Sequence, residues 1–206
     1  MANQPDPATK FPHSTPRLYG SCTLFDNNSG TITFTSKILG TNRLFRATLD
    51  LDPGSNLPVF VKLVPGSYGV EVYRFLETKH LAPALYGYSK VDGAPIAYIM
   101  EYLDPSECQS TLHELIHFGD ALPSDARLRE SLRNVLDALE SRSYVHGDLR
   151  PNNFMVGIDE AMDEIEFKVI DFDWAGEAGE VITCGAEPLN RRYRVAWEGW
   201  RNYLPW

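Results

Sequence analysis

The sequence predicts an α+β fold in two lobes, with strands in the first half and mainly helices in the second. Residues 31–39 and 44–51 alternate apolar with polar side chains, and residues 57–64 are apolar and β-branched, which predicts an antiparallel meander. The longest helical pattern, residues 124–142, comes later and carries apolar side chains along one face. Strands followed by helices are typical of α+β proteins, so we expect a cleft between two lobes.

Weaker patterns supply the remaining elements. Helical spacing of apolar residues predicts a helix over residues 67–80, with Ser67 as its N-cap. Asp92-Gly93 is a typical hairpin turn between two β-type segments. The other predicted elements are strands at 86–90 and 95–103, a short helix at 111–118, and strands at 154–158 and 164–170.

Composition limits the classes of partner. The chain has 206 residues, of which 43% are hydrophobic, which suits one compact domain. A net charge of −9 argues against a nucleic-acid or membrane partner. Three cysteines, no apolar stretch of membrane-spanning length and a polar tail at residues 1–16 predict a protein of the cytoplasm or nucleus.

Polar residues flank the last predicted hairpin. Residues 146–153 read HGDLRPNN, and the second strand of the hairpin runs into Asp171. An antiparallel hairpin brings the residue before its first strand next to the residue after its second, so Asn153 and Asp171 should lie together. Their oxygen atoms suit Mg²⁺, which takes few protein ligands and completes its shell with water and phosphate.

Asp148 lies in the same loop, five positions before Asn153. Phosphoryl transfer needs a carboxylate that orients and deprotonates the attacking hydroxyl, and cations over the transferred phosphate. Asp148 suits the first role and Arg150 the second. The alternative is a polar loop whose Asp and Asn side chains cap turns, but the joint order of loop, hairpin and Asp171-Phe172 favours a functional site.

This order of motifs resembles that of the protein-kinase-like superfamily, in which D-x-x-x-x-N is followed by a hairpin and D-F. HGDL is also similar to aminoglycoside and choline phosphotransferases, and HGDLRP with IDFDWAG most resembles short kinase-like proteins of fungi. The resemblance implies a β-rich N-lobe with one helix, residues 17–102. It implies a truncated, mainly helical C-lobe, residues 103–206, without the substrate-binding helical subdomain.

The same resemblance implies ATP and Mg²⁺ as cofactors. Lys62 would pair with the α- and β-phosphates, and Glu71 would pair with Lys62, with Glu77 as a substitute. The segment IMEYL is similar to the kinase hinge. Met100 would guard the back of the adenine pocket, while the carbonyl of Glu101 and the amide of Leu103 would meet the adenine edge.

Several positions depart from the kinase pattern. The glycine-rich phosphate loop is absent, since only LGTNR stands between the first two predicted strands. Gly147 stands where many protein kinases carry Arg, which argues against control by an activation-loop phosphate. Asp173 replaces the Gly of D-F-G, and the chain ends at Trp206 without an A-P-E motif. A partner protein could therefore supply the surface that the shortened C-lobe lacks.

Three functions follow from these observations. The favoured one is an ATP- and Mg²⁺-dependent phosphotransferase acting on a protein or small-molecule hydroxyl, since all catalytic side chains are present. The second is a pseudokinase that binds nucleotide as a scaffold. The third is a zinc hydrolase, because HELIH at residues 113–117 matches H-E-x-x-H, with Glu140 as a further ligand. The predicted helix is short for such a site.

Overall fold

The computed structural model describes residues 19–38, 43–51, 55–103, 109–118, 125–159 and 164–179. The predicted tail at residues 1–16 lies outside them. Contacts divide the chain into two units, residues 1–66 with 84–102 and residues 67–83 with 103–206. These units differ from the lobes expected at 17–102 and 103–206, which stay a prediction, in assigning residues 67–83 to the second. No helix of the described part is long and apolar enough to cross a membrane.

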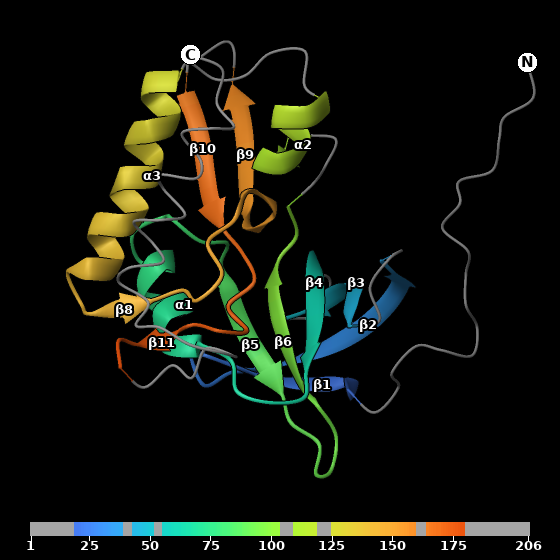
Figure 1. Cartoon of the computed structure of the whole chain (residues 1–206). Coiled ribbons are helices and arrows are strands. Elements are labelled where there is room, and N and C mark those ends of the chain that lie inside the picture. Colours follow the sequence, from blue (N-terminus) through green and yellow to red (C-terminus); the bar gives the residue numbers. More distant parts are fainter. Residues whose placement is uncertain are drawn as a thin grey trace, which may run out of the picture. The chain divides into compact units, whose positions relative to one another are not determined.

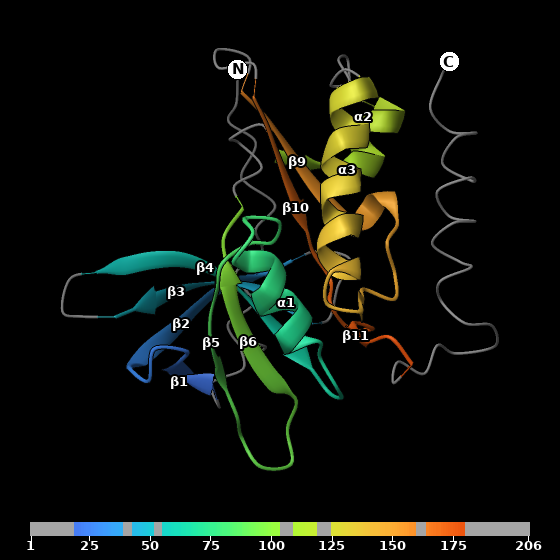
Figure 2. The same ribbon diagram turned by 90° about the vertical axis from the view of Figure 1, so that its left-hand side faces the viewer.

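The first unit is a closed antiparallel barrel of six strands in the order β1-β2-β3-β4-β6-β5 (Figures 1 and 2). The expected meander and the β5–β6 hairpin are confirmed. Pairing of β1 with β5, at Thr23 with Tyr88, closes the barrel. The strands are β1 (Ser21–Leu24), β2 (Ser29–Lys37), β3 (Leu44–Asp50), β4 (Asn56–Val64), β5 (Leu85–Ser89) and β6 (Ile96–Glu101).

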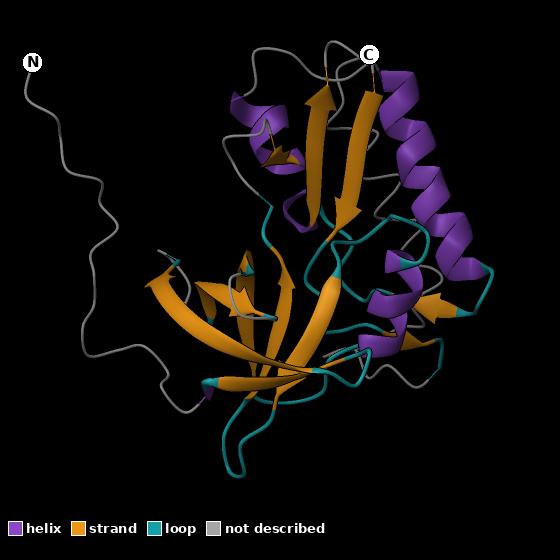
Figure 3. Ribbon diagram, turned by 180° about the vertical axis from the view of Figure 1, so that it is seen from behind, coloured by secondary structure: helices purple, strands orange, loops and turns teal. Residues whose placement is uncertain are grey.

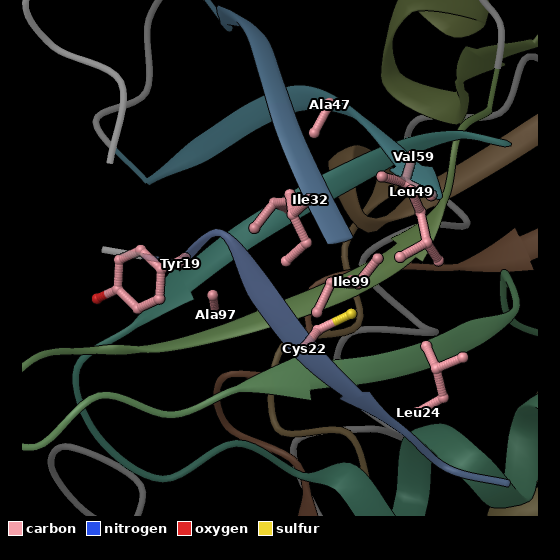
Figure 4. Close-up of a cluster of buried hydrophobic side chains, with 10 residues drawn as sticks. Tyr19, Cys22, Leu24, Ile32, Ala47, Leu49, Val59, Ala97 and Ile99 are labelled. Carbon is pink, nitrogen blue, oxygen red and sulfur yellow. The ribbon is translucent and has the colours of Figure 1, made fainter. Parts of the chain in front are cut away.

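Alternating side chains of these strands fill the barrel interior (Figure 4). Successive side chains of a strand point to opposite faces, so Val59 and Val61 are fully buried in this core while Phe60 and Lys62 are only partly buried. Burial of this apolar surface is the main stabilising contribution to the unit. The core residues are Tyr19, Cys22, Leu24, Ile32, Ala47, Leu49, Val59, Val61, Ala97 and Ile99.

Cys22 should be chemically inert in the folded protein. Its side chain is 5% exposed, and burial raises the pKa of the thiol despite its hydrogen bond to the Gly30 carbonyl. Because the thiolate is the reactive form, we expect iodoacetamide to modify Cys22 at least about 10-fold more slowly in native protein than in guanidinium chloride. Peptide mass spectrometry measures this, and equal rates in both conditions would contradict the buried position.

The second unit holds the three α-helices of the described residues and two small sheets (Figure 3). In this view α2 and α3 lie on either side of the β9–β10 hairpin. The sheets have the strand orders β10-β9-β7 and β11-β8. The elements are α1 (Val70–Glu77), β7 (Gln109–Thr111), α2 (Leu112–Phe118), α3 (Asp125–Glu140), β8 (Tyr144–Val145), a 3₁₀ turn (Pro151–Asn153), β9 (Phe154–Asp159), β10 (Glu164–Val169) and β11 (Gly176–Glu177).

Two helices of this unit test the predicted periodicity. The apolar face expected on α3 is confirmed, since four of its side chains are buried: Leu128, Leu132, Val135 and Leu139. The start expected for α1 at Ser67 is wrong, because Gly69 is its N-cap. The Gly69 amide donates to the carbonyl of Phe172, far along the chain. This tertiary hydrogen bond competes with the local capping preference of Ser67.

Candidate active site

The two predicted metal ligands lie at the open end of the β9–β10 hairpin. Its register pairs Phe154 with Val169, and the Ile170 amide donates to the Asn153 carbonyl at 2.9 Å. Asn153 therefore lies beside the backbone that leads into Asp171. The expected hairpin is confirmed, and the metal-ligand role of Asn153 and Asp171 stays a prediction.

Asp148 is oriented by two donors that meet at one of its carboxylate oxygens. The Asn153 side-chain amide donates to Oδ2 at 2.9 Å, and the Arg150 guanidinium lies 2.8 Å from the same oxygen. Asp148 Oδ1 has no hydrogen bond or ion pair with any residue that the structure describes. One oxygen of the carboxylate is thus held in place and the other is left without a partner among the described residues. A group that takes a proton from a bound substrate needs such an oxygen.

The side-chain amide of Asn153 makes its hydrogen bonds through the nitrogen, and its role as a metal ligand stays a prediction. The side chain is 5% exposed, and its nitrogen donates to both the carbonyl and the carboxylate of Asp148, at 2.8 and 2.9 Å. Its Oδ1 accepts no hydrogen bond from the described residues. This oxygen and the partly exposed carboxylate of Asp171 are ligand types that Mg²⁺ prefers.

The backbone turns sharply at the predicted D-F motif. Asp171 has φ of 69°, a conformation that side-chain-bearing residues seldom adopt and that surrounding structure must hold in place. Asp173, which replaces the usual Gly, is not among the positive-φ residues of the described part. An aspartate is therefore tolerated at 173 without backbone strain, and the left-handed residue of this segment is Asp171.

Aromatic side chains surround Phe172, which is fully buried. Its ring lies 4.3 Å from Tyr73 of α1 and 4.9 Å from His146, centroid to centroid. His146 is also fully buried, and its Nε2 lies 3.1 Å from the Ile170 carbonyl. A carbonyl only accepts hydrogen bonds, so Nε2 carries the proton and His146 has a structural role in the loop.

Tyr68 lies at the edge of the same cluster, with its ring 6.4 Å from that of Phe172. Burial, followed by the charges of Tyr73, Asp173 and Asp171, holds the pKa of Tyr68 well above its usual value. The residue therefore stays a neutral phenol beside the two carboxylates. Sequence reasoning missed Tyr68 and Tyr73, since an apolar pattern in a helix does not reveal which distant residue it packs against.

The remaining predicted residues fall in both units. Lys62 of β4 is partly buried and pairs in register with Leu44 and Tyr98. Glu71 is exposed in the first turn of α1, whose buried residues are Val72, Tyr73 and Leu76. The ion pair expected between Lys62 and Glu71 stays a prediction.

The predicted hinge residues lie at the end of β6 and just after it. Met100 is partly buried and Leu103 is buried. Glu101 and Ala84 form a reciprocal pair, in which the Glu101 amide donates to the Ala84 carbonyl at 2.8 Å and Glu101 Oε2 accepts from the Ala84 amide at 2.9 Å. The Glu101 side chain thus has a structural role of its own. Adenine contacts through the Glu101 carbonyl and the Leu103 amide remain a prediction.

The HELIH segment uses its glutamate to start a helix. Glu114 Oε2 accepts from the amide and the hydroxyl of Thr111, both at 2.8 Å, and Thr111 Oγ1 accepts from the Glu114 amide at 3.1 Å. This is a capping box. The rings of His113 and His117 lie 4.3 Å apart, but no group of three His, Cys, Asp or Glu side chains suited to a metal occurs within the described ranges.

The sequence was compared with those of known proteins and protein families. No model of a known protein family matches the sequence. The chain is 29% identical to the Aurora kinase of Saccharomyces cerevisiae over 106 residues, which is 52% of this chain and 26% of that kinase. It is 28% identical to the Aurora kinase of Schizosaccharomyces pombe over 136 residues, 66% of this chain and 33% of the kinase. The chain thus spans a third or less of the length of these relatives.

Comparison with solved structures also finds a kinase. The structure of the Cydia pomonella Granulovirus kinase, PK-1, matches with a TM-score of 0.59 at 16% identity, over 78% of this chain and 60% of the viral one. The predicted α+β class with a strand-rich N-terminal part is confirmed. The fold of this chain is therefore similar to that of the viral kinase, and parts of its sequence are similar to the two Aurora kinases.

Proposed function

We propose that the protein is an ATP- and Mg²⁺-dependent phosphotransferase that moves the γ-phosphate to a hydroxyl acceptor. The observation that carries this proposal is the arrangement around Asp148. Asn153 and Arg150 hold one carboxylate oxygen, while the other has no partner among the described residues. A carboxylate fixed in this way is suited to orient an alcohol and to take its proton as the oxygen attacks phosphorus.

The geometry around Asp148 supports the role of Arg150, and the resemblance to kinases suggests the other roles. Arg150 is 60% exposed while it touches Asp148, so its remaining N–H groups are able to meet a phosphate. Asn153 and Asp171 would hold Mg²⁺, which when bound neutralises charge on the phosphates. Lys62 with Glu71 would fix the α- and β-phosphates. Met100, Glu101 and Leu103 would line the adenine pocket.

A nucleotide-binding scaffold is the competing function, and calorimetry separates the two. We expect ATP to bind the purified protein in the presence of Mg²⁺ and to lose measurable affinity when EDTA removes the metal, because two of the proposed contacts act through Mg²⁺. We expect transfer of labelled γ-phosphate when protein and small-alcohol acceptors are offered.

The outcomes of this experiment differ by function. Mg²⁺-dependent binding without transfer to any offered acceptor would identify a scaffold. No binding of ATP under either condition would contradict both nucleotide-based functions. Stoichiometric zinc, lost on His113→Ala, would instead support the hydrolase.

A further inference from the structure

Two glycines from distant parts of the chain enclose the segment that carries Asp171. A Cβ at Gly147 would lie 2.6 Å from the Cβ of Trp174 and would also collide with the Trp174 carbonyl. A Cβ at Gly69 would lie 2.6 Å from the carbonyl oxygen of Ala175. Real Cβ atoms do not come this close to other heavy atoms, so only glycine allows both approaches.

Backbone hydrogen bonds hold the same segment against α1. The Phe172 carbonyl accepts from the Gly69 amide at 3.0 Å and from the Ala175 amide at 3.2 Å. The Phe172 ring is buried between Tyr73 and His146. Residues 171–175 are therefore fixed from one side by the start of α1 and from the other by the loop that carries His146 and Gly147.

These contacts help to hold the unusual backbone conformation of Asp171. A residue with φ of 69° persists only where its surroundings impose that conformation. Both glycine contacts fall within four residues of Asp171. Loss of either one would let the segment relax and would carry the Asp171 carboxylate away from Asn153.

We propose that Gly69 and Gly147 are positioning residues for the metal site, acting through Ala175 and Trp174 respectively. This rests on the proposed function, since it assigns a metal-ligand role to Asp171. It also gives a physical reason for Gly147 where many protein kinases carry Arg. The close approach of Trp174 leaves no room for any side chain at position 147.

Four glycine-to-alanine variants separate collision from backbone strain. Gly147→Ala introduces both, because φ is +82°, and Gly69→Ala introduces a collision at the ordinary φ of −73°. Gly179→Ala introduces strain alone at φ of +101°, and Gly66→Ala introduces neither, since both positions have open space. Only the first two should affect the metal site.

The readout is the Mg²⁺ concentration that gives half-maximal ATP binding. We expect it to rise about 10-fold or more in Gly69→Ala and Gly147→Ala, as is typical when residues that orient a metal ligand are lost. We expect changes within about twofold in Gly66→Ala and Gly179→Ala. Circular dichroism and thermal unfolding establish that each variant is folded.

Ala175→Gly is a gentler variant that keeps the test decisive if Gly69→Ala does not fold. It removes the methyl group facing Gly69 without creating a collision, and it should raise the Mg²⁺ requirement and speed hydrogen exchange of residues 171–175. If folded Gly69→Ala, Gly147→Ala and Ala175→Gly all keep the wild-type Mg²⁺ requirement, the inference is wrong. If wild-type protein binds no ATP with Mg²⁺, the proposed function fails, and this inference fails with it.

Discussion

Replacing Asp148 with Asn is expected to lower phosphate transfer about 10²–10⁴-fold, the usual contribution of a positioned general base. Asparagine has nearly the same shape, so its carbonyl oxygen can still accept from Asn153 and Arg150, which meet at Oδ2 in the native protein. The group left facing the acceptor is then an amide nitrogen, which does not take a proton. ATP binding should change little, because the proposed phosphate and metal contacts come from other residues.

The measurement is single-turnover transfer of labelled γ-phosphate, with ATP affinity determined in parallel. Asp137→Asn is the matched control, since it removes one carboxylate from an exposed position of α3. It should keep wild-type transfer. Wild-type rates in Asp148→Asn would show that Asp148 is not the base, whereas loss of ATP binding would point to a structural role instead.

Replacing Phe172 with Ala is expected to lower the free energy of unfolding by about 3–5 kcal/mol, as is usual when a buried aromatic side chain is truncated. The ring is fully buried and lies against Tyr73, His146 and Tyr68. Its removal leaves a cavity where α1, the loop at residues 146–153 and the D-F segment meet. Urea unfolding followed by circular dichroism measures the loss.

Trp174→Ala is the control for this substitution. It removes a larger ring from the same segment, but Trp174 is 48% exposed, so the loss should be below about 1 kcal/mol. The Cβ and carbonyl of residue 174, which approach Gly147, are retained. A loss below about 1 kcal/mol in Phe172→Ala as well would mean that burial of Phe172 does not stabilise this unit.

Local patterns were enough to predict most of the described fold. The meander β2–β4 and the hairpin β9–β10 follow from alternation and turn residues, and Asn153 lies beside the end of β10, which leads into Asp171. The two-residue strands β8 and β11 could not be predicted, because so short a segment has no measurable period. Closure of the barrel by β1 depends on pairing with the distant β5.

The residues of the candidate site also differ in whether the sequence could predict them. Asp148 and Asn153 could be selected from the sequence because their types and spacing match the motif D-x-x-x-x-N. The contact of Gly69 with Ala175 could not, since the two residues are far apart in the chain and neither has a reactive group. Local propensity favoured Ser67 as the cap of α1, and a tertiary hydrogen bond from Gly69 to Phe172 decided otherwise.

Asn153 makes two structural contacts at the candidate site. Its side-chain nitrogen fixes Asp148, and its main-chain carbonyl fixes Ile170 next to Asp171. Under the proposed function, random mutagenesis followed by selection for weaker metal dependence should recover almost no changes at position 153, because each substitution would disturb the proposed base together with the proposed metal site. Adaptive change would instead concentrate at positions such as Trp174, whose exposed ring leaves both contacts intact.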